Sequence, residues 1–353
     1  MIKIKRNFKK DKLNTGKTDG RISINQLEWR NMRLKLWSIS FMICIVAISF
    51  AAMGQSPGRP MVVNIMIDAE LSPFAQNASS QEKENAEIGS LLKMLDEIDS
   101  RGLNTTIYFT GDFISKRTEN ASYEDYAILI SSKPNHELAM HSMKTGEKLG
   151  LLSYEEQLSL LTETMGLLEG TYIRDGQPQK VKGFRPQYFS QNESTYKILD
   201  EMGIEYNSGY QAGLLYAPGH ENDTWPYMVE NHTFYAVPIS THRIEGKLTY
   251  ICDLCSMQSV GLDGEQWSDL LIDEFDEGAK RGDPVVVLFH NFVSGKDEEY
   301  LDAFVRFLDY VVAENVVSLT TADLVEMAKR DRSISGNSSA TGGIESLNQP
   351  LVA

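Results

Sequence analysis

Four short segments of this 353-residue chain carry polar side chains where β-strands are expected to end. In chain order they are residues 67–70 (Ile-Asp-Ala-Glu), 136–142 (His-Glu-Leu-Ala-Met-His-Ser), 184–188 (Phe-Arg-Pro-Gln-Tyr) and 288–290 (Leu-Phe-His). Parallel α/β folds collect their chemistry at the carboxyl ends of their strands, so we expect these segments to meet. Carboxylates, imidazoles and a guanidinium gathered there can supply a base, metal ligands and an acid. The sequence therefore predicts a metal-assisted hydrolase site.

The carboxylates and the last histidine have the clearest individual roles. Asp68 and Glu70 end an apolar run, so that one can act as general base and the other as metal ligand if the chain turns after Asp68. A solvated pair at a strand end is the alternative for these two residues taken by themselves. His290 ends the apolar run 285–289, which delivers it to one end of the sheet, where it could protonate a leaving amine.

The two middle segments offer ligands and an orienting cation. His136 and His141 flank an apolar strand, and an imidazole at the exit of that strand is a common metal ligand beside carboxylates. Arg185 precedes Pro186, which keeps its backbone extended. Its guanidinium could orient Asp68 by paired hydrogen bonds, and a purely structural role is the alternative.

Alternating apolar runs and amphipathic stretches must position these side chains. Strands are predicted at 62–67, 105–110, 137–140, 183–185, 204–207, 234–238, 285–289 and 316–319, with helices between them. Ser153 and Glu156 form a capping-box signature at the start of one helix. Repeated β-α units predict an α/β fold with a largely parallel sheet or barrel, within a single domain from 61 to 329.

Charge and hydropathy divide the chain before that domain. Residues 1–35 carry 11 Lys or Arg against 3 Asp or Glu, whereas the remaining residues carry 23 against 46, which excludes nucleic acid as a partner. Residues 36–53 contain no charge and form a membrane anchor or a signal-peptide core, with a buried helix as the alternative. The flanking basic residues place the N-terminus in the cytoplasm and the acidic body outside. Translation could start at Met1 or at Met32.

Three further features concern the exported part. Residues 54–60 read as a linker, and residues 330–353 as a disordered polar tail. Cys252 and Cys255 are the only cysteines beyond the apolar run, and a disulfide in a small loop or two free thiols is favoured over a zinc site. Seven Asn-x-Ser/Thr sequons fit an exported glycoprotein, namely those at Asn77, Asn104, Asn120, Asn192, Asn222, Asn231 and Asn337.

The ordered set of motifs resembles the polysaccharide deacetylase family with the NodB homology domain, which removes acetyl groups from sugars with a divalent metal. The segment 106–111 (Thr-Ile-Tyr-Phe-Thr-Gly) looks like the second strand of that family, and 136–142, 183–188 and 288–290 look like its histidine, Arg-Pro and last catalytic motifs. The resemblance covers most of residues 61–329 and implies a distorted (β/α) barrel of seven to eight mainly parallel strands.

The resemblance also implies roles for single residues. Asp68 would be the base, oriented by Arg185, and His290 would be the acid, with Asp253 a candidate partner for it. The backbone N–H near Tyr188 would help to hold the oxyanion. Glu70 and His141 would bind the metal, which is Zn in this interpretation, with Co or Ni as alternatives.

Two departures from the family pattern concern the metal. Ala69 separates the two acidic residues, and Glu70 stands where most relatives have Asp. Thr145 stands where relatives have a second ligand histidine, and a neutral hydroxyl is a poor zinc ligand beside imidazole or carboxylate. Thr145 itself or Glu147 could fill the gap, as could a loop histidine at position 220, 232 or 242.

The sequence thus predicts a polysaccharide deacetylase, a hydrolase of carbon–nitrogen bonds other than peptide bonds. Its substrate would be an acetylated amino-sugar polysaccharide or glycan outside the cytoplasm. The protein would be anchored in the membrane through residues 36–53, or secreted. The alternative is a catalytically impaired protein of the same fold that binds glycan, because Thr145 leaves the metal set incomplete.

Overall fold

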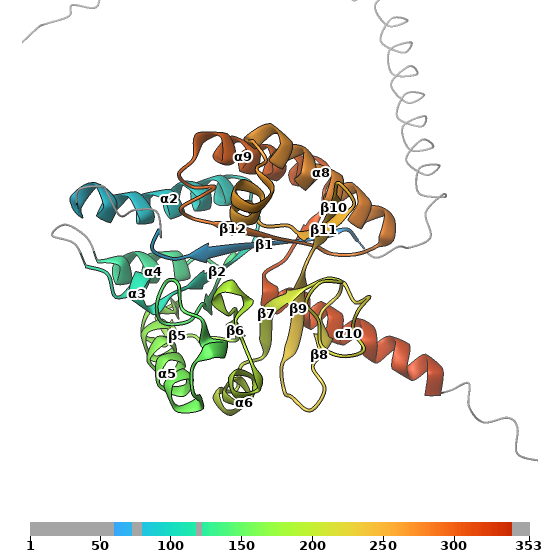
Figure 1. Cartoon of the computed structure of the whole chain (residues 1–353), viewed down its shortest axis with the longest axis horizontal. Helices are drawn as coiled ribbons and strands as arrows, with labels where there is room; N and C mark the ends of the chain where they lie inside the picture. The colour runs from blue at the N-terminus through green and yellow to red at the C-terminus, as the bar shows by residue number, and fades with distance from the viewer. Residues whose placement is uncertain (1–59, 73–79, 118–121, 341–353) are drawn as a thin grey trace, which may run out of the picture. The chain divides into compact units, whose positions relative to one another are not determined.

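The chain divides into two units, Met1–Gly58 and Arg59–Ala353. The structure, a computed structural model, describes residues 60–72, 80–117 and 122–340, all of which belong to the second unit (Figure 1). The predictions for residues 1–59, among them the basic segment, the membrane anchor and most of the linker, lie outside the described residues. Within the described part, no helix combines the length and the apolar composition needed to cross a bilayer.

A mainly parallel nine-stranded sheet forms the centre of the second unit. Along the sheet the order is β12-β1-β2-β3-β6-β7-β9-β8, and β13 pairs with β1. Only β8 is antiparallel to its neighbour. The strands are β1 (Val62–Ala69), β2 (Thr105–Phe109), β3 (His136–Met140), β6 (Gly183–Phe184), β7 (Tyr206–Gln211), β8 (Tyr227–Met228), β9 (Tyr235–Ile239), β12 (Val285–His290) and β13 (Val317–Ser318).

Helices connect the parallel strands and lie outside the sheet, as Figure 1 shows for α2, α8 and α9 beside β1 and β12. Their bounds are α2 (Ser80–Ser100), α3 (Gly111–Ile114), α4 (Tyr123–Ser131), α5 (Tyr154–Thr171), α6 (Glu193–Met202), α7 (Asp253–Cys255), α8 (Gly264–Arg281), α9 (Glu298–Ala313) and α10 (Thr321–Ala340). The predicted capping box is confirmed, because Ser153 and Glu156 cap the start of α5 reciprocally.

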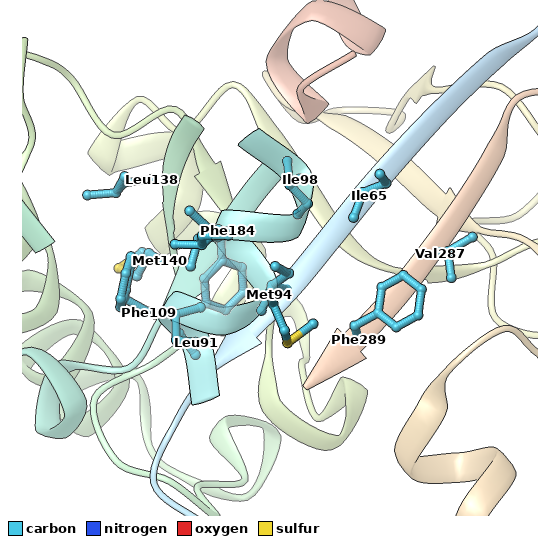
Figure 2. Close-up of a cluster of buried hydrophobic side chains, with 14 of the residues drawn as sticks. Ile65, Leu91, Met94, Ile98, Phe109, Leu138, Met140, Phe184, Val287 and Phe289 are labelled. Carbon is cyan, nitrogen blue, oxygen red and sulfur yellow. The ribbon is translucent and has the colours of Figure 1, made fainter. Parts of the chain in front are cut away.

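Two hydrophobic clusters lie on opposite faces of the sheet, because side chains alternate along a strand. The outer cluster joins strand residues such as Ile65, Phe109 and Phe289 to helix residues such as Leu91 (Figure 2). The inner cluster lies within the curved sheet and includes Met66, Tyr108, Ala139, Tyr206, Val286 and Leu288. Along β1 the even-numbered residues point inward, so Asp68 faces the same side as Met66.

The sheet curves until its two ends approach each other. The N–H of Ser240, just after β9, donates to Val286 O of β12 at 3.0 Å. A second link is the parallel bridge between Cys252 and Leu288. This is the distorted barrel that the sequence predicts, and the curvature brings the carboxyl ends of distant strands together.

All eight predicted strands are present, and their ends are shifted by at most four residues. Strand β8 and two short hairpins were missed; the hairpins are β4 (Ile173–Arg174) with β5 (Gln177–Pro178), and β10 (Thr241–Ile244) with β11 (Lys247–Tyr250). Asp175 and Gly176 both have positive φ in the first turn, which is the Asp-Gly signal of a tight hairpin. The signal was available in the sequence, but neither strand is long enough to show an alternating pattern.

The expected start of the polar tail at residue 330 needs correction. Helix α10 runs from Thr321 to Ala340 and so continues past that point. Leu324, Val325 and Ala328 are buried and fix the first turns of this helix on the domain, from which it extends into the polar stretch. Residues 341–353 lie outside the described residues.

Candidate active site

Sheet register places the proposed base beside the proposed acid. On β1 Asp68 is the register partner of His290 on β12, on one side, and of Tyr108 on β2, on the other. All three positions therefore lie at one level of the sheet and face its interior. The gap between Asp68 Oδ2 and His290 Nε2 is 3.8 Å.

The intervening Ala69 preserves the pairing of the two carboxylates. With a side-chain period of two, residues 68 and 70 point to the same face and residue 69 to the other, where Ala69 joins the outer cluster. Glu70 follows the last residue of β1, and its N–H donates to Asn291 Oδ1 at 3.1 Å. Asp68 and Glu70 both line a cavity of about 210 Å³ at this end of the sheet.

His141 presents one nitrogen to both carboxylates. Its Nδ1 lies 2.9 Å from the carbonyl oxygen of Arg185 and donates to it, which leaves the lone pair on Nε2. That Nε2 lies 3.3 Å from Asp68 Oδ2 and 3.9 Å from Glu70 Oε2. Burial lowers the pKa of His141, although Asp68 opposes the shift, so the imidazole is neutral at neutral pH and able to bind a metal.

Arg185 reaches Asp68 from the neighbouring part of the sheet. Its Nε lies 3.2 Å from Asp68 Oδ1, although the two groups do not adopt hydrogen-bond geometry. Gln187 ties this segment to the histidine loop, because its Nε2 donates to Lys144 O at 2.7 Å and to His141 O at 3.3 Å. The predicted approach of Arg185 to Asp68 is present, as an ion pair rather than a pair of hydrogen bonds.

Asp253 is the hydrogen-bond partner of His290, the proposed acid. Its Oδ1 lies 2.7 Å from His290 Nδ1, and its Oδ2 accepts from the His290 backbone N–H at 2.8 Å. Burial by itself would lower the pKa of His290, but the Asp253 carboxylate and the Cys252 thiol outweigh burial and raise it well above the usual value. His290 is therefore held as a cation, the form that can donate a proton.

A second group of side chains whose types can bind a metal includes His290, the proposed acid, itself. Ligand atoms of Cys252, Asp253 and His290 lie within 4.8 Å of one another. Both oxygens of Asp253 already accept hydrogen bonds, including those from Leu254 N and from Ser294 Oγ, at 2.6 and 2.7 Å. The oxygens of Asp253 are therefore occupied by hydrogen bonds, and this carboxylate orients His290. Cys252 and Cys255 are free thiols, one of the two states that the sequence left open.

Glu70 and His141 fit a divalent cation as two protein ligands. The Glu70 carboxylate accepts no hydrogen bond from any described residue, and burial raises its pKa to about 8, helped by Asp68 and Asp112 and opposed by His290. A buried carboxylate in this state is stabilised by a bound cation. His141 Nε2, 3.9 Å away, supplies the second donor. Carboxylate and neutral imidazole are donors that Zn²⁺ accepts.

The third-ligand candidates are engaged elsewhere. Thr145 lines the cavity, but its Oγ1 accepts from Leu71 N at 3.0 Å and lies 3.4 Å from Asp112 Oδ1. Glu147 is not among the cavity residues, and its Oε2 accepts from Met143 N at 3.1 Å.

The remaining histidines each have a carboxylate partner away from this cavity. The partners of His220, His232 and His242 are Asp223, Asp200 and Glu274. His136 lies at the opposite end of β3 from the cavity and pairs with Asp99 at 2.9 Å. None of these side chains lines the cavity that Asp68 and Glu70 share.

Tyr188 lies at the mouth of the cavity with a strained backbone. Its φ is 53° and that of Phe189 is 54°, in the left-handed region that aromatic residues rarely adopt. Backbone strain of this kind is often found at functional sites. The Tyr188 side chain is 62% exposed, so the surroundings of its ring do not explain the strain.

The cavity also has a wall of residues that sequence reasoning did not assign. Tyr250 and Leu254 line it. No spacing in the sequence links these positions to Asp68, because they reach the cavity through the closure of the barrel.

Comparisons with known proteins bear on the fold. No protein-family model and no curated protein matches the sequence. A crystal structure assigned as a polysaccharide deacetylase from Mycobacterium smegmatis matches with a TM-score of 0.60 and 16% identity, over 84% of this chain and 97% of the other. One from Pseudomonas aeruginosa PAO1, assigned likewise, gives 0.59 and 14%, over 76% and 91%.

A third structure, Puue allantoinase, matches with a TM-score of 0.59 and 14% identity, over 77% of this chain and 91% of that one. At such identities the likeness establishes the fold and leaves the reaction to be argued from the site. The described domain therefore has the NodB-like (β/α) barrel fold of the polysaccharide deacetylases.

Proposed function

We propose that this protein is a metal-dependent hydrolase that removes the N-acetyl group from an amino sugar of an extracellular polysaccharide or glycan. The observation that carries the proposal is the placement of Asp68 between a neutral histidine and a protonated one. Asp68 Oδ2 lies 3.3 Å from His141 Nε2 and 3.8 Å from His290 Nε2. Amide hydrolysis needs such an arrangement of base, electrophile site and acid within one cavity.

Asp68 acts as the base. It accepts a proton from a water molecule, whose oxygen attacks the acetyl carbonyl carbon. Arg185, 3.2 Å from Asp68 Oδ1, fixes the carboxylate so that Oδ2 faces the cavity. His290 acts as the acid and delivers a proton from Nε2 to the leaving amine, while Asp253 holds the imidazolium through Nδ1 at 2.7 Å.

Glu70 and His141 would hold the metal. When bound there, a divalent ion supplies Lewis-acid polarisation of the acetyl carbonyl. The backbone N–H near Tyr188 is a second stabilising group for the oxyanion, which fits the strained φ of 53° at this residue. We propose Zn²⁺ as the ion, with Co²⁺ or Ni²⁺ as alternatives, because a carboxylate with an imidazole suits these metals.

The alternative function is glycan binding without hydrolysis. It is favoured by one observation, the engagement of the Thr145 hydroxyl with Leu71 N at 3.0 Å, which leaves the metal with two protein ligands. We favour hydrolysis because Asp68, Arg185, Asp253 and His290 keep an arrangement that binding alone does not need. A buried set of charges is costly to maintain.

We further propose that the domain works outside the cytoplasm. This part of the proposal rests on the sequence, in which an uncharged segment at 36–53 follows a basic N-terminus and precedes an acidic body. Substrate and location then agree, since a surface polysaccharide is reached by a protein that is anchored or secreted.

Acetate release decides between the two functions. The full chain, loaded with Zn²⁺, should release acetate from N-acetylated chito-oligosaccharides, and a chelator should stop this release. The metal content of the purified protein is measured in parallel. Folded protein that takes up no metal and releases no acetate would contradict hydrolysis, and saturable binding of the oligosaccharide without acetate would establish the alternative.

Replacing Thr145 with His should strengthen zinc binding. A third protein ligand completes the set found in catalytic zinc sites, and we expect the Kd to fall about tenfold or more. Thr145→Val is the matched control, because it removes the same hydrogen bonds to Leu71 and Asp112 without adding a ligand. Titration with Zn²⁺ against a competing chelator measures both variants, and equal Kd values for them would show that the metal does not lie next to residue 145.

A further inference from the structure

Tyr108 is the register neighbour of Asp68 on the side away from His290. It belongs to the inner cluster and is fully buried. Its hydroxyl donates to Thr321 Oγ1 at 3.2 Å, which holds the outer end of the ring in place. The ring thus stands beside Asp68 within the barrel, although Tyr108 is not among the cavity residues.

The ring face of Tyr108 is turned toward Arg185. The guanidinium carbon lies 4.1 Å from the ring centroid, well within the distance of a cation–π interaction. The Arg185 residue is only 1% exposed, so its charge has almost no contact with water. The attraction between a cation and an aromatic face is strongest where water is excluded.

Few other groups compensate the charge of Arg185. Its Nε and Nη1 make no hydrogen bond with a described residue, and its Nη2 contacts Met66 Sδ, a weak acceptor, at 2.7 Å. One carboxylate, that of Asp68, lies 3.2 Å from Nε. A buried guanidinium normally has several hydrogen-bond acceptors. Here the aromatic face takes the place of the missing ones.

We propose that Tyr108 is a positioning residue for the deacetylation reaction, because its ring holds the buried guanidinium of Arg185 in the orientation that directs Asp68 into the cavity. The proposal rests on the proposed function for its kinetic consequence. The contact itself does not depend on that function. Tyr108 acts through Arg185 and does not touch the substrate.

Two substitutions separate the ring from the hydroxyl. Tyr108→Phe keeps the aromatic face and removes the contact with Thr321, whereas Tyr108→Leu removes the face and keeps an apolar side chain in the inner cluster. We expect Tyr108→Phe to stay within about threefold of the wild type in kcat and in KM. Tyr108→Leu should lower kcat about 100-fold with KM within about threefold, because a misdirected Asp68 impairs the chemical step rather than binding.

A double-mutant cycle in unfolding tests the contact without any activity. Tyr108→Leu and Arg185→Met are measured singly and together by denaturant unfolding of the full chain. Tyr108→Leu should raise the unfolding equilibrium constant in both backgrounds. We expect this increase to be about 30-fold larger when residue 185 is Arg than when it is Met. If Arg185→Met fails to fold, the comparison of the Phe and Leu variants decides.

Two results would overturn the inference. One is a Tyr108→Phe variant as impaired as Tyr108→Leu, which would assign the effect to the hydroxyl. The other is an unfolding ratio below about twofold, which would show that the ring does not stabilise the cation. Absence of acetate release from the wild type would instead contradict the proposed function, and the cycle would then decide the contact alone.

Discussion

Replacing Asp68 with Asn should lower kcat for acetate release by about 10³-fold, because an amide cannot accept the proton of the attacking water. Asn has nearly the same shape as Asp, so the neighbours of residue 68 keep their positions. These are Arg185 at 3.2 Å, His141 at 3.3 Å and His290 at 3.8 Å. The metal content should change little, since Glu70 and His141 are the proposed ligands. Steady-state kinetics and metal analysis on the same preparation check both parts.

Glu70→Gln provides the contrast to that variant. It alters a proposed ligand instead of the base, so zinc content and rate should fall together, and added Zn²⁺ should restore part of the rate. In Asp68→Asn added Zn²⁺ should restore none. A rate for Asp68→Asn within tenfold of the wild type would show that another group is the base.

Replacing Asp253 with Asn should have the second largest effect. The carboxylate binds His290 Nδ1 at 2.7 Å and holds the imidazole as a cation. Without the negative charge, the pKa of His290 falls from well above its usual 6.5 toward and below that value, because burial now dominates. We expect kcat at pH 8 to fall about 10³-fold. The basic limb of kcat/KM should move to lower pH, which a pH–rate profile measures.

The raised pKa of His290 also predicts how the stability of Asp253→Asn depends on pH. A histidine with a raised folded-state pKa adds stability that is fully present below about pH 6.5 and is lost as the pH rises through the folded-state value. Asp253→Asn removes this term, so its loss of stability should be greater at pH 6 than at high pH. We expect a cost of about 3–5 kcal/mol at pH 6, because a buried ion pair is broken.

Ser294→Ala is the matched control for Asp253. It removes one donor to the carboxylate, Ser294 Oγ at 2.7 Å, and leaves the ion pair with His290 in place. The rate should therefore stay within about tenfold of the wild type, with a stability cost of about 1 kcal/mol. A basic limb that does not move in Asp253→Asn, measured beside this control, would exclude His290 as the acid.

The raised pKa of Glu70 predicts how occupancy of the proposed metal site depends on pH. A buried carboxylate with a pKa of about 8 binds protons at neutral pH, and a proton competes with a metal for it. Metal occupancy should thus rise with pH in this range. The engaged hydroxyl of Thr145 does nothing to reduce that competition, whereas an imidazole at this position would favour the metal.

Strand positions and the direction of side chains were determined by the sequence, because apolar content and a period of two are local properties. These properties sufficed for all eight predicted strands. The common face of Asp68 and Glu70 was not predicted, because a turn was expected after Asp68, whereas β1 continues through Ala69. Helix capping at Ser153 was equally local. The continuation of α10 to Ala340 could not be predicted from local sequence, since it depends on the packing of the first turns of the helix on the domain.

Only the tertiary structure decided which groups act on one another. The register that sets Asp68 beside His290 and Tyr108, and the barrel closure that brings Asp253 to His290, depend on packing between segments far apart in the chain. Spacing carries no record of such contacts, so Asp253 remained one candidate and Tyr108 was not assigned a role. The same limit applies to Thr145, whose identity was plain in the sequence but whose engagement with Leu71 required the folded loop. The local sequence pattern determines which side chains each strand directs to each face of the sheet, whereas long-range packing determines which of these side chains come into contact.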